Sequence, residues 1–187
     1  MRRLLPGGTI AAGPAHVAMP QFSFTTIATY AAQIITAFVV AILLFSFQRQ
    51  YRKSYLRHWV AGWIALAIYH TVSLAGFALA VAYHLPARSP LRLVMALVAA
   101  VAGFAQIGWF AFGPYEILRR RPIREADSRR ILIVLALVSV FTVVLFLDES
   151  GSSSARYVAR VGVRAFLASI VFFAVAFNLW RARNRRN

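Results

Sequence analysis

The chain contains no cysteine, only five acidic residues and a single lysine among its 187 residues. The absence of cysteine excludes disulfide bonds, cysteine-ligated zinc, iron–sulfur clusters and thiol catalysis. The sequence also lacks an HExxH motif, a glycine-rich phosphate loop and a pair of carboxylates within an apolar segment. These are the patterns that metal-dependent and phosphoryl-transfer enzymes require. We therefore expect the protein not to be an enzyme.

Long apolar runs are what the sequence has in place of charged residues. No Asp, Glu, Lys or Arg occurs between Leu4 and Gln48, and charge-poor runs follow at residues 58–83, 93–115, 131–147 and 165–180. A helix needs about 20 mostly apolar residues to cross a bilayer. The chain therefore predicts an all-α fold, a polytopic membrane helix bundle with five transmembrane helices.

The spans divide the chain into three predicted parts. We expect an irregular N-terminal tail at residues 1–25, a five-helix transmembrane domain at 26–180 and a basic tail at 181–187. Three prolines and three glycines between residues 6 and 21 keep the first part irregular. Its opening, MRRLLPGG, lacks the apolar stretch of a signal peptide.

The basic residues predict the orientation of the chain. A net charge of +16 would suggest nucleic acid as a partner of a soluble protein, but here the Arg residues lie beside the spans. Fourteen of the 21 basic residues fall in segments 49–57, 119–130 and 181–187. The positive-inside rule then places the N-terminus outside and the C-terminus inside. We expect a bacterial cytoplasmic (inner) membrane protein, with anionic lipids and no nucleic acid among its partners.

His70 lies near the middle of the second predicted span, about 20 Å along it. A neutral imidazole at this depth can ligate haem iron or the magnesium of a chlorophyll-type pigment, or relay a proton. A bis-histidine haem needs a second mid-membrane histidine, and the other three are predicted at or beyond the span edges. The main interpretation is therefore an interhelical hydrogen bond to Gln33, Thr36 or Gln106, with cofactor binding as the alternative.

Arg156, Arg160 and Arg164 repeat every four residues, which places them on one face of a helix. Such a stripe can bind a carboxylate, a phosphate or a lipid headgroup. The alternative is that the helix projects beyond the bilayer, with Arg164 reaching toward the headgroups and Asp148 and Glu149 neutralising part of the stripe. Exposing Arg164 fully to lipid is disfavoured by about 2.5–3.5 kcal/mol, so we expect it to face protein, water or headgroups.

Glu116 follows the third apolar run directly and has Arg119 and Arg120 three and four residues further on. This spacing predicts an intrahelical ion pair, with a proton-relay carboxylate as the alternative. Pro114 is predicted to kink or end this span.

Small residues recur four positions apart in three of the spans. Such spacing lets helices approach closely, either within the bundle or against another integral membrane protein. The residues are Ala61, Ala65, Gly76, Ala80, Ala99, Gly103, Ala165 and Ser169.

Two segments, QRQYRKSYLRHWVAGWIALAIY and RRRPIREADSRR, give the chain a resemblance to a known class. Over about residues 40–147 it resembles the N-terminal multi-span regions of bacterial sensor histidine kinases and diguanylate cyclases. The resemblance implies a membrane input module that passes a signal to a cytoplasmic output domain. The sequence departs from that class because it ends seven residues after Trp180, with no coiled coil, phosphoacceptor helix or GGDEF-type domain.

Three functions remain from these patterns. The leading hypothesis is a non-catalytic integral membrane subunit that acts by lateral helix contact, as an accessory component of a larger membrane complex of the respiratory or photosynthetic type. The second is a sensory input module in which the Arg stripe or the His70 region reads a ligand. The third is a lipid- or pigment-binding membrane protein.

Overall fold

The computed structural model describes residues 24–86, 89–145 and 153–184, and at 145, 153–161, 179 and 182–183 it describes the backbone alone. Over these ranges the chain forms five α-helices and no strand, which confirms the all-α prediction. The helices are α1 (Phe24–Tyr51), α2 (Ser54–Ala82), α3 (Pro90–Arg119), α4 (Glu125–Leu145) and α5 (Ser153–Asn184). The predicted tail at residues 1–25 lies almost entirely outside the described residues.

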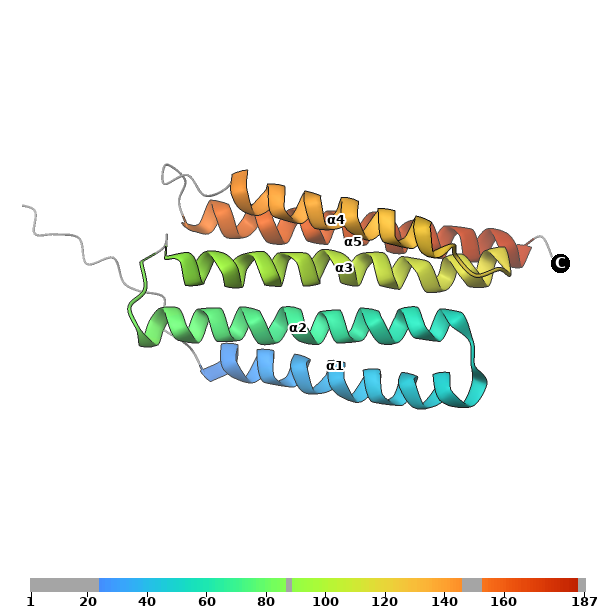
Figure 1. The fold of residues 1–187 in the computed structure, drawn as a ribbon, viewed down its shortest axis with the longest axis horizontal. Helices are drawn as coiled ribbons and strands as arrows, with labels where there is room; N and C mark the ends of the chain where they lie inside the picture. The colour runs from blue at the N-terminus through green and yellow to red at the C-terminus, as the bar shows by residue number, and fades with distance from the viewer. Residues whose placement is uncertain (1–23, 87–88, 146–152, 185–187) are drawn as a thin grey trace, which may run out of the picture.

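Consecutive helices run in opposite directions and lie side by side as an elongated bundle (Figure 1). The α1 helix packs on α2, and α2 packs on α3. The α3 helix also contacts both α4 and α5, so it is the central element of the bundle. It has nine buried residues, more than any other helix over the described residues.

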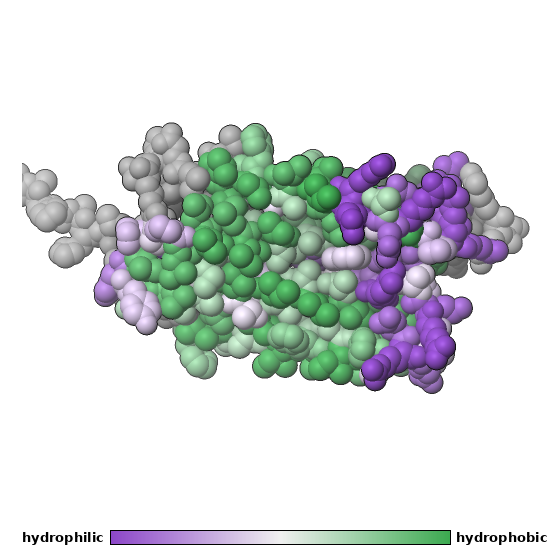
Figure 2. All heavy atoms as spheres, in the orientation of Figure 1, coloured by the Kyte–Doolittle hydropathy of each residue, from purple (hydrophilic) through white to green (hydrophobic). Residues whose placement is uncertain are grey.

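Three of the helices are long and apolar enough to cross a membrane, namely α1, α2 and α3. The α4 helix is 21 residues long and carries Glu125 and Asp127 in its first turn, and the apolar stretch of α5 runs from Gly162 to Asn178. Figure 2 shows apolar side chains over the middle of the visible face of the bundle and hydrophilic side chains gathered at one end. This is the surface of a membrane protein, because a water-soluble bundle would turn its apolar side chains inward.

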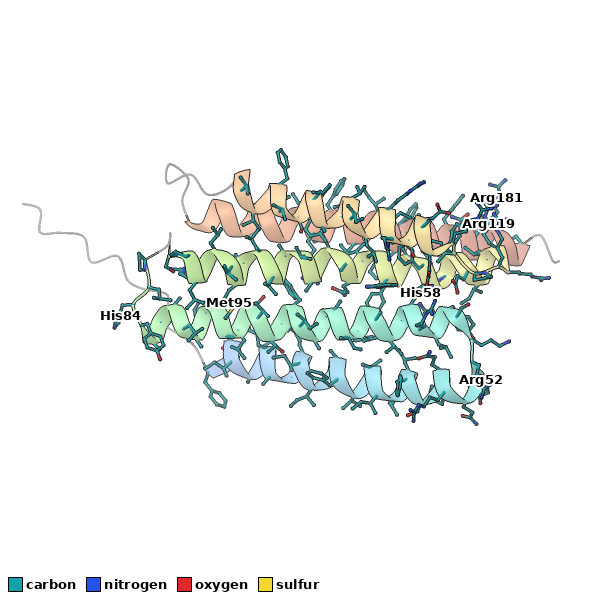
Figure 3. The ribbon with its side chains drawn as sticks, in the orientation of Figure 1. Arg52, His58, His84, Met95, Arg119 and Arg181 are labelled. Carbon is teal, nitrogen blue, oxygen red and sulfur yellow. The ribbon has the colours of Figure 1, made fainter. Side chains whose placement is uncertain are left out.

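The hydrophilic end, called the basic end below, carries the α1–α2 and α3–α4 loops and the last turns of α5. Arg52, Arg119 and Arg181 lie there, whereas His84 lies at the opposite end (Figure 3). Each of the three basic segments that the sequence predicts on one side of the membrane therefore has a residue at this end of the bundle.

Short local signals set the helix ends. The Ser89 hydroxyl accepts a hydrogen bond from the Arg92 backbone N–H, and Pro90 occupies the first position of α3, where its missing N–H costs nothing. Arg52, His84 and Arg120 have positive φ values of 50°, 46° and 53°, the left-handed conformation that commonly ends helices. Pro114 does not end α3, which continues to Arg119.

Glycines allow α3 to pack tightly against its neighbours. A Cβ atom on Gly62 of α2 would overlap the ring of Phe110, and one on Gly113 of α3 would overlap the indole of Trp59. Within a membrane there is little hydrophobic driving force between helices, so close backbone approach of this kind provides much of the packing energy.

We predict that Gly113→Ala destabilises the bundle although alanine is the better helix former. The added methyl group meets the rigid indole of Trp59, and overpacking of this kind costs about 1–3 kcal/mol. Gly162→Ala is the matched control, because a Cβ there has nothing within 4 Å. Thermal unfolding in mild detergent, followed by circular dichroism, should show a lower midpoint for the first variant only. Equal midpoints would contradict the packing described here.

Candidate functional site

Arg164 lies between α5 and the middle of α3. One of its guanidinium nitrogens donates a hydrogen bond to Oε1 of Gln106. The guanidinium carbon lies 3.8 Å from the centroid of the Tyr69 ring, a cation–π contact with α2. Gln106 is 16 residues into α3, which is about 24 Å along a helix of about 45 Å. The charge of Arg164 is therefore held near mid-bundle rather than at an end.

Gly103 provides the space for this side chain. A Cβ atom built on Gly103 would lie 3.0 Å from Nε of Arg164 and 3.2 Å from a ring carbon of Tyr69. A larger side chain at this position would push the guanidinium away from α3. The packing role that the sequence suggested for Gly103 is thus the accommodation of an arginine.

A cavity of about 190 Å³ opens beside the guanidinium. Its walls come from α3 and α5, and its two polar residues are Gln106 and Arg164. The remaining lining is apolar: Ile107, Phe110, Ala165, Ala168 and Phe172. A few polar groups set in an apolar wall are typical of small-molecule sites, although this cavity is smaller than the roughly 300–1,000 Å³ of most ligand pockets.

No carboxylate among the described residues pairs with Arg164. A guanidinium has five N–H donors, and the described protein acceptor is the single oxygen of Gln106. A charged group at this depth normally pairs with an opposite charge or marks a binding site. The arrangement can therefore accept an anion, to which the unused N–H groups would donate charge-assisted hydrogen bonds.

The predicted stripe of three arginines is only partly described. Arg156 and Arg160 belong to α5 by backbone, but their side chains lie outside the described residues, as do Asp148 and Glu149. Arg164 is half-buried against α3, so of the expected surroundings, protein, water or headgroups, the structure places it against protein.

His70 lies among tyrosines. Its ring centroid is 5.8 Å from that of Tyr30 on α1 and 5.0 Å from that of Tyr69. Its Nδ1 atom is buried and has no hydrogen-bond partner among the described residues. The predicted interhelical bond to Gln33, Thr36 or Gln106 is not among the described hydrogen bonds, and Gln106 Oε1 binds Arg164 instead.

These surroundings bear on the cofactor hypothesis for His70. A haem iron or pigment magnesium would have to reach a ring nitrogen, and Nδ1 is enclosed by protein. No group of three His, Cys, Asp or Glu residues that could hold a metal ion occurs in the described part of the chain. A cofactor could reach Nδ1 only if the helices around it separated, so the nitrogen left to ligate a metal would be Nε2.

A second polar cluster lies at the basic end and joins α2, α3 and the α3–α4 loop. Glu116 accepts hydrogen bonds from the Ser54 hydroxyl at 2.6 Å and from the backbone N–H of Ile123 at 2.9 Å. Its Oε1 atom also lies 2.9 Å from Nε2 of His58. Glu116 is 5% exposed and His58 is 3% exposed. These four residues, Ser54, His58, Glu116 and Ile123, are called the Glu116 cluster below.

The ion pair predicted between Glu116 and Arg119 or Arg120 is wrong. Both arginines are exposed, and the carboxylate instead turns into the bundle toward the start of α2. The physical reason is that this direction offers three donors together with the positive end of the α2 dipole.

Sequence reasoning also missed His58, which it placed at a span edge. The available signals were the spacing of four between Ser54 and His58 at the start of a helix, and an acid directly after an apolar run. Neither signal indicates that the two segments meet.

The eight small residues fall into three groups by exposure. Ala65, Ala99 and Gly103 are buried, and Ala61, Gly76 and Ala80 are half-buried. Ala165 and Ser169 are exposed on α5. The residues on α2 and α3 thus lie at helix contacts, whereas the pair on α5 faces outward.

Comparisons with known proteins do not assign the chain to a family. No family model matches it, and neither a curated protein nor a solved structure matches it at a significant level.

Proposed function

We propose that the protein is a non-catalytic, membrane-embedded binding module that senses an anionic amphiphile at Arg164. The observation that carries the proposal is a guanidinium held at mid-bundle beside an apolar cavity, with no described carboxylate partner. A charged headgroup would meet Arg164 and Gln106, and an attached apolar chain would lie along Ile107, Phe110 and Phe172. A fatty acid and an anionic lipid share this chemistry.

The contacts of the same site suggest which helix moves when a ligand binds. The α5 helix contacts α3 and continues beyond the cavity to Asn184 at the basic end. An anion that takes over the donors now directed at Gln106 changes the main polar link between the two helices. A ligand shifts an equilibrium only through such differential contacts, so α5 is the element that we expect to move.

We also propose that all five helices cross a bacterial inner membrane, with the basic end in the cytoplasm. The gathering of Arg52, Arg119 and Arg181 at one end (Figure 3) supports this orientation, because cytoplasmic loops are rich in arginine and lysine. Anionic headgroups on that side would meet the exposed basic loops.

Lateral association with a larger membrane complex is a second candidate function. Its support is the exposed pair Ala165 and Ser169 on α5, because small residues four apart let a further helix approach closely. The two candidate functions are compatible, since a helix that responds to a ligand can also contact a partner.

We predict that Arg164→Gln weakens oleate binding about 10- to 100-fold, the equivalent of the roughly 1.5–3 kcal/mol of a hydrogen bond to a charged group. Native mass spectrometry of the protein in neutral detergent, titrated with oleate, measures this. Arg181→Gln, an exposed arginine further along α5, should bind as the wild type does. Oleyl alcohol, the uncharged analogue, should bind poorly to all three proteins.

Competing probes distinguish the sources of the anion. Preferential retention of phosphatidylglycerol over phosphatidylcholine would identify a membrane lipid, and retention of oleate alone would identify a free fatty acid. Binding of inorganic phosphate as strong as that of oleate would contradict recognition of an apolar chain. Equal oleate binding by wild type and Arg164→Gln would overturn the site altogether.

The proposed topology predicts which single cysteines can be labelled in intact cells. The chain has no cysteine of its own, so His84→Cys and Arg121→Cys each carry one thiol. A membrane-impermeant maleimide should label the first in intact cells and the second only after permeabilisation. Labelling of both in intact cells, or of neither, would contradict the orientation.

The association hypothesis predicts that Ser169→Leu disrupts a complex. After mild solubilisation the wild type should migrate with much larger partners on a native gel, and the variant should migrate alone. Ala174→Leu, also at an exposed small residue of α5, is the control. A wild-type protein that runs as a stable monomer, and whose deletion leaves every membrane complex unchanged, would rule out this function.

A further inference from the structure

The Glu116 cluster joins three segments that are distant in sequence. Ser54 and His58 come from the first two turns of α2, Glu116 from the last turn of α3, and Ile123 from the loop that leads into α4. The pairs Ser54–Glu116 and His58–Glu116 are 62 and 58 residues apart. A single buried carboxylate therefore holds the start of α2 and the α3–α4 loop in place.

The cluster is arranged around an ionised carboxylate. The Ser54 hydroxyl and the Ile123 N–H both donate to Glu116, and Nε2–H of His58 is positioned to donate as well. An ionised carboxylate accepts without donating, so it satisfies all three groups. The N-terminus of α2 adds a favourable dipole at the same place.

Fixed positive charges surround the cluster without entering it. They belong to the α1–α2 loop, α2, α3, the α3–α4 loop and the first turns of α4, and α4 also contributes Glu125 and Asp127. All of these side chains are exposed: Arg52, Lys53, Arg57, Arg119, Arg120, Arg121, Arg124, Arg129, Arg130, Glu125 and Asp127. Among the described residues the one ionisable group in direct contact with Glu116 is His58.

His58 is enclosed by aromatic rings. It stacks on Trp109 with centroids 5.5 Å apart and meets the Phe112 ring edge-on at the same separation. Its Nδ1 atom is buried and has no hydrogen-bond partner among the described residues. The surrounding rings thus leave Nε2 as the nitrogen of His58 that reaches Glu116.

A proton added to Glu116 weakens this arrangement. The neutral carboxyl still accepts hydrogen bonds, but the bonds from Ser54, His58 and Ile123 lose the charge assistance that makes them about twice as strong as neutral ones. Protonation therefore favours a looser cluster. Of the three hydrogen bonds, the one from Ile123 breaks most readily, because Ile123 lies in a loop whose neighbouring residues are exposed.

We propose that the Glu116 cluster is a proton-binding site at which proton uptake releases the α3–α4 loop. The carboxylate form holds Ile123 and keeps the loop against the bundle. The protonated form releases the loop. The loop then moves away from the start of α2 together with Arg120, Arg121 and Arg124. Because the donors stabilise the ionised form, the link is present at higher pH and is lost as the pH falls. This proposal uses none of the residues of the Arg164 site and stands independently of it.

Loop mobility tests the proposal directly. Arg121→Cys is the only thiol in its background and can carry a nitroxide spin label in neutral lipid nanodiscs. As the pH falls from about 7 to about 3, a range that includes the ordinary titration of a glutamate carboxyl, its electron paramagnetic resonance spectrum should change from restricted to mobile. The same label on His84→Cys, at the opposite end of the bundle (Figure 3), should not change.

Two further variants separate proton binding from a merely structural role. Ser54→Ala removes one donor to the carboxylate, so the midpoint of the mobility change should move to higher pH while the fold is kept. Glu116→Gln should leave the loop mobile at every pH. A loop spectrum that does not depend on pH, a midpoint unchanged in Ser54→Ala, or an equal change at His84→Cys would each overturn the proposal.

Discussion

The arrangement of this bundle depends on α3 being slim enough to contact three helices at once. Gly113 receives the indole of Trp59 from α2, Gly103 receives Arg164 from α5, and a Cβ on Gly108 would lie 2.8 Å from a methyl carbon of Leu135 on α4. A side chain at any of these positions would separate α3 from one neighbour. Because lipid competes with protein for apolar surface, helices in a membrane remain together only where they approach closely. The glycines of α3 therefore determine how closely the neighbouring helices pack against it.

The central position of α3 also explains where the polar groups lie. Gln106 and Glu116 are ten residues apart on this helix, about 15 Å along its axis, and each is the acceptor of its own cluster. Residues on outer helices face lipid over part of their surface, whereas α3 is covered by neighbours on several sides. Polar side chains that would be costly in hydrocarbon can thus be satisfied there.

Hydropathy and loop chemistry were sufficient to predict the helices. Apolar runs and Arg-rich turns indicated five helices, but not all of their ends, since α4 begins at Glu125 rather than 131 and α5 extends from Ser153 to Asn184 rather than from 165 to 180. The sites were harder to predict, since Arg164 was expected to face protein, water or headgroups, with no indication of Tyr69 or Gln106 as its neighbours. For Glu116 the prediction was wrong, because local spacing favours Arg119 and Arg120 while the actual donors come from α2. Such contacts depend on helix order and rotation, and hydropathy does not encode either.

The energetics of Arg164 support the proposed anion site, because the side chain is stabilised without having its charge neutralised. Placing an arginine at membrane depth costs about 2.5–3.5 kcal/mol on the insertion scale. A hydrogen bond to a charged group returns about 1.5–3 kcal/mol, and a cation–π contact about 0.5–2 kcal/mol. Gln106 and Tyr69 therefore offset most of the cost without neutralising the charge. A carboxylate partner would have fixed the guanidinium more firmly and removed its attraction for an anion. Because its neighbours are an amide and an aromatic ring, Arg164 keeps its attraction for an anion beside the cavity. An arginine with a purely structural role would not need that attraction.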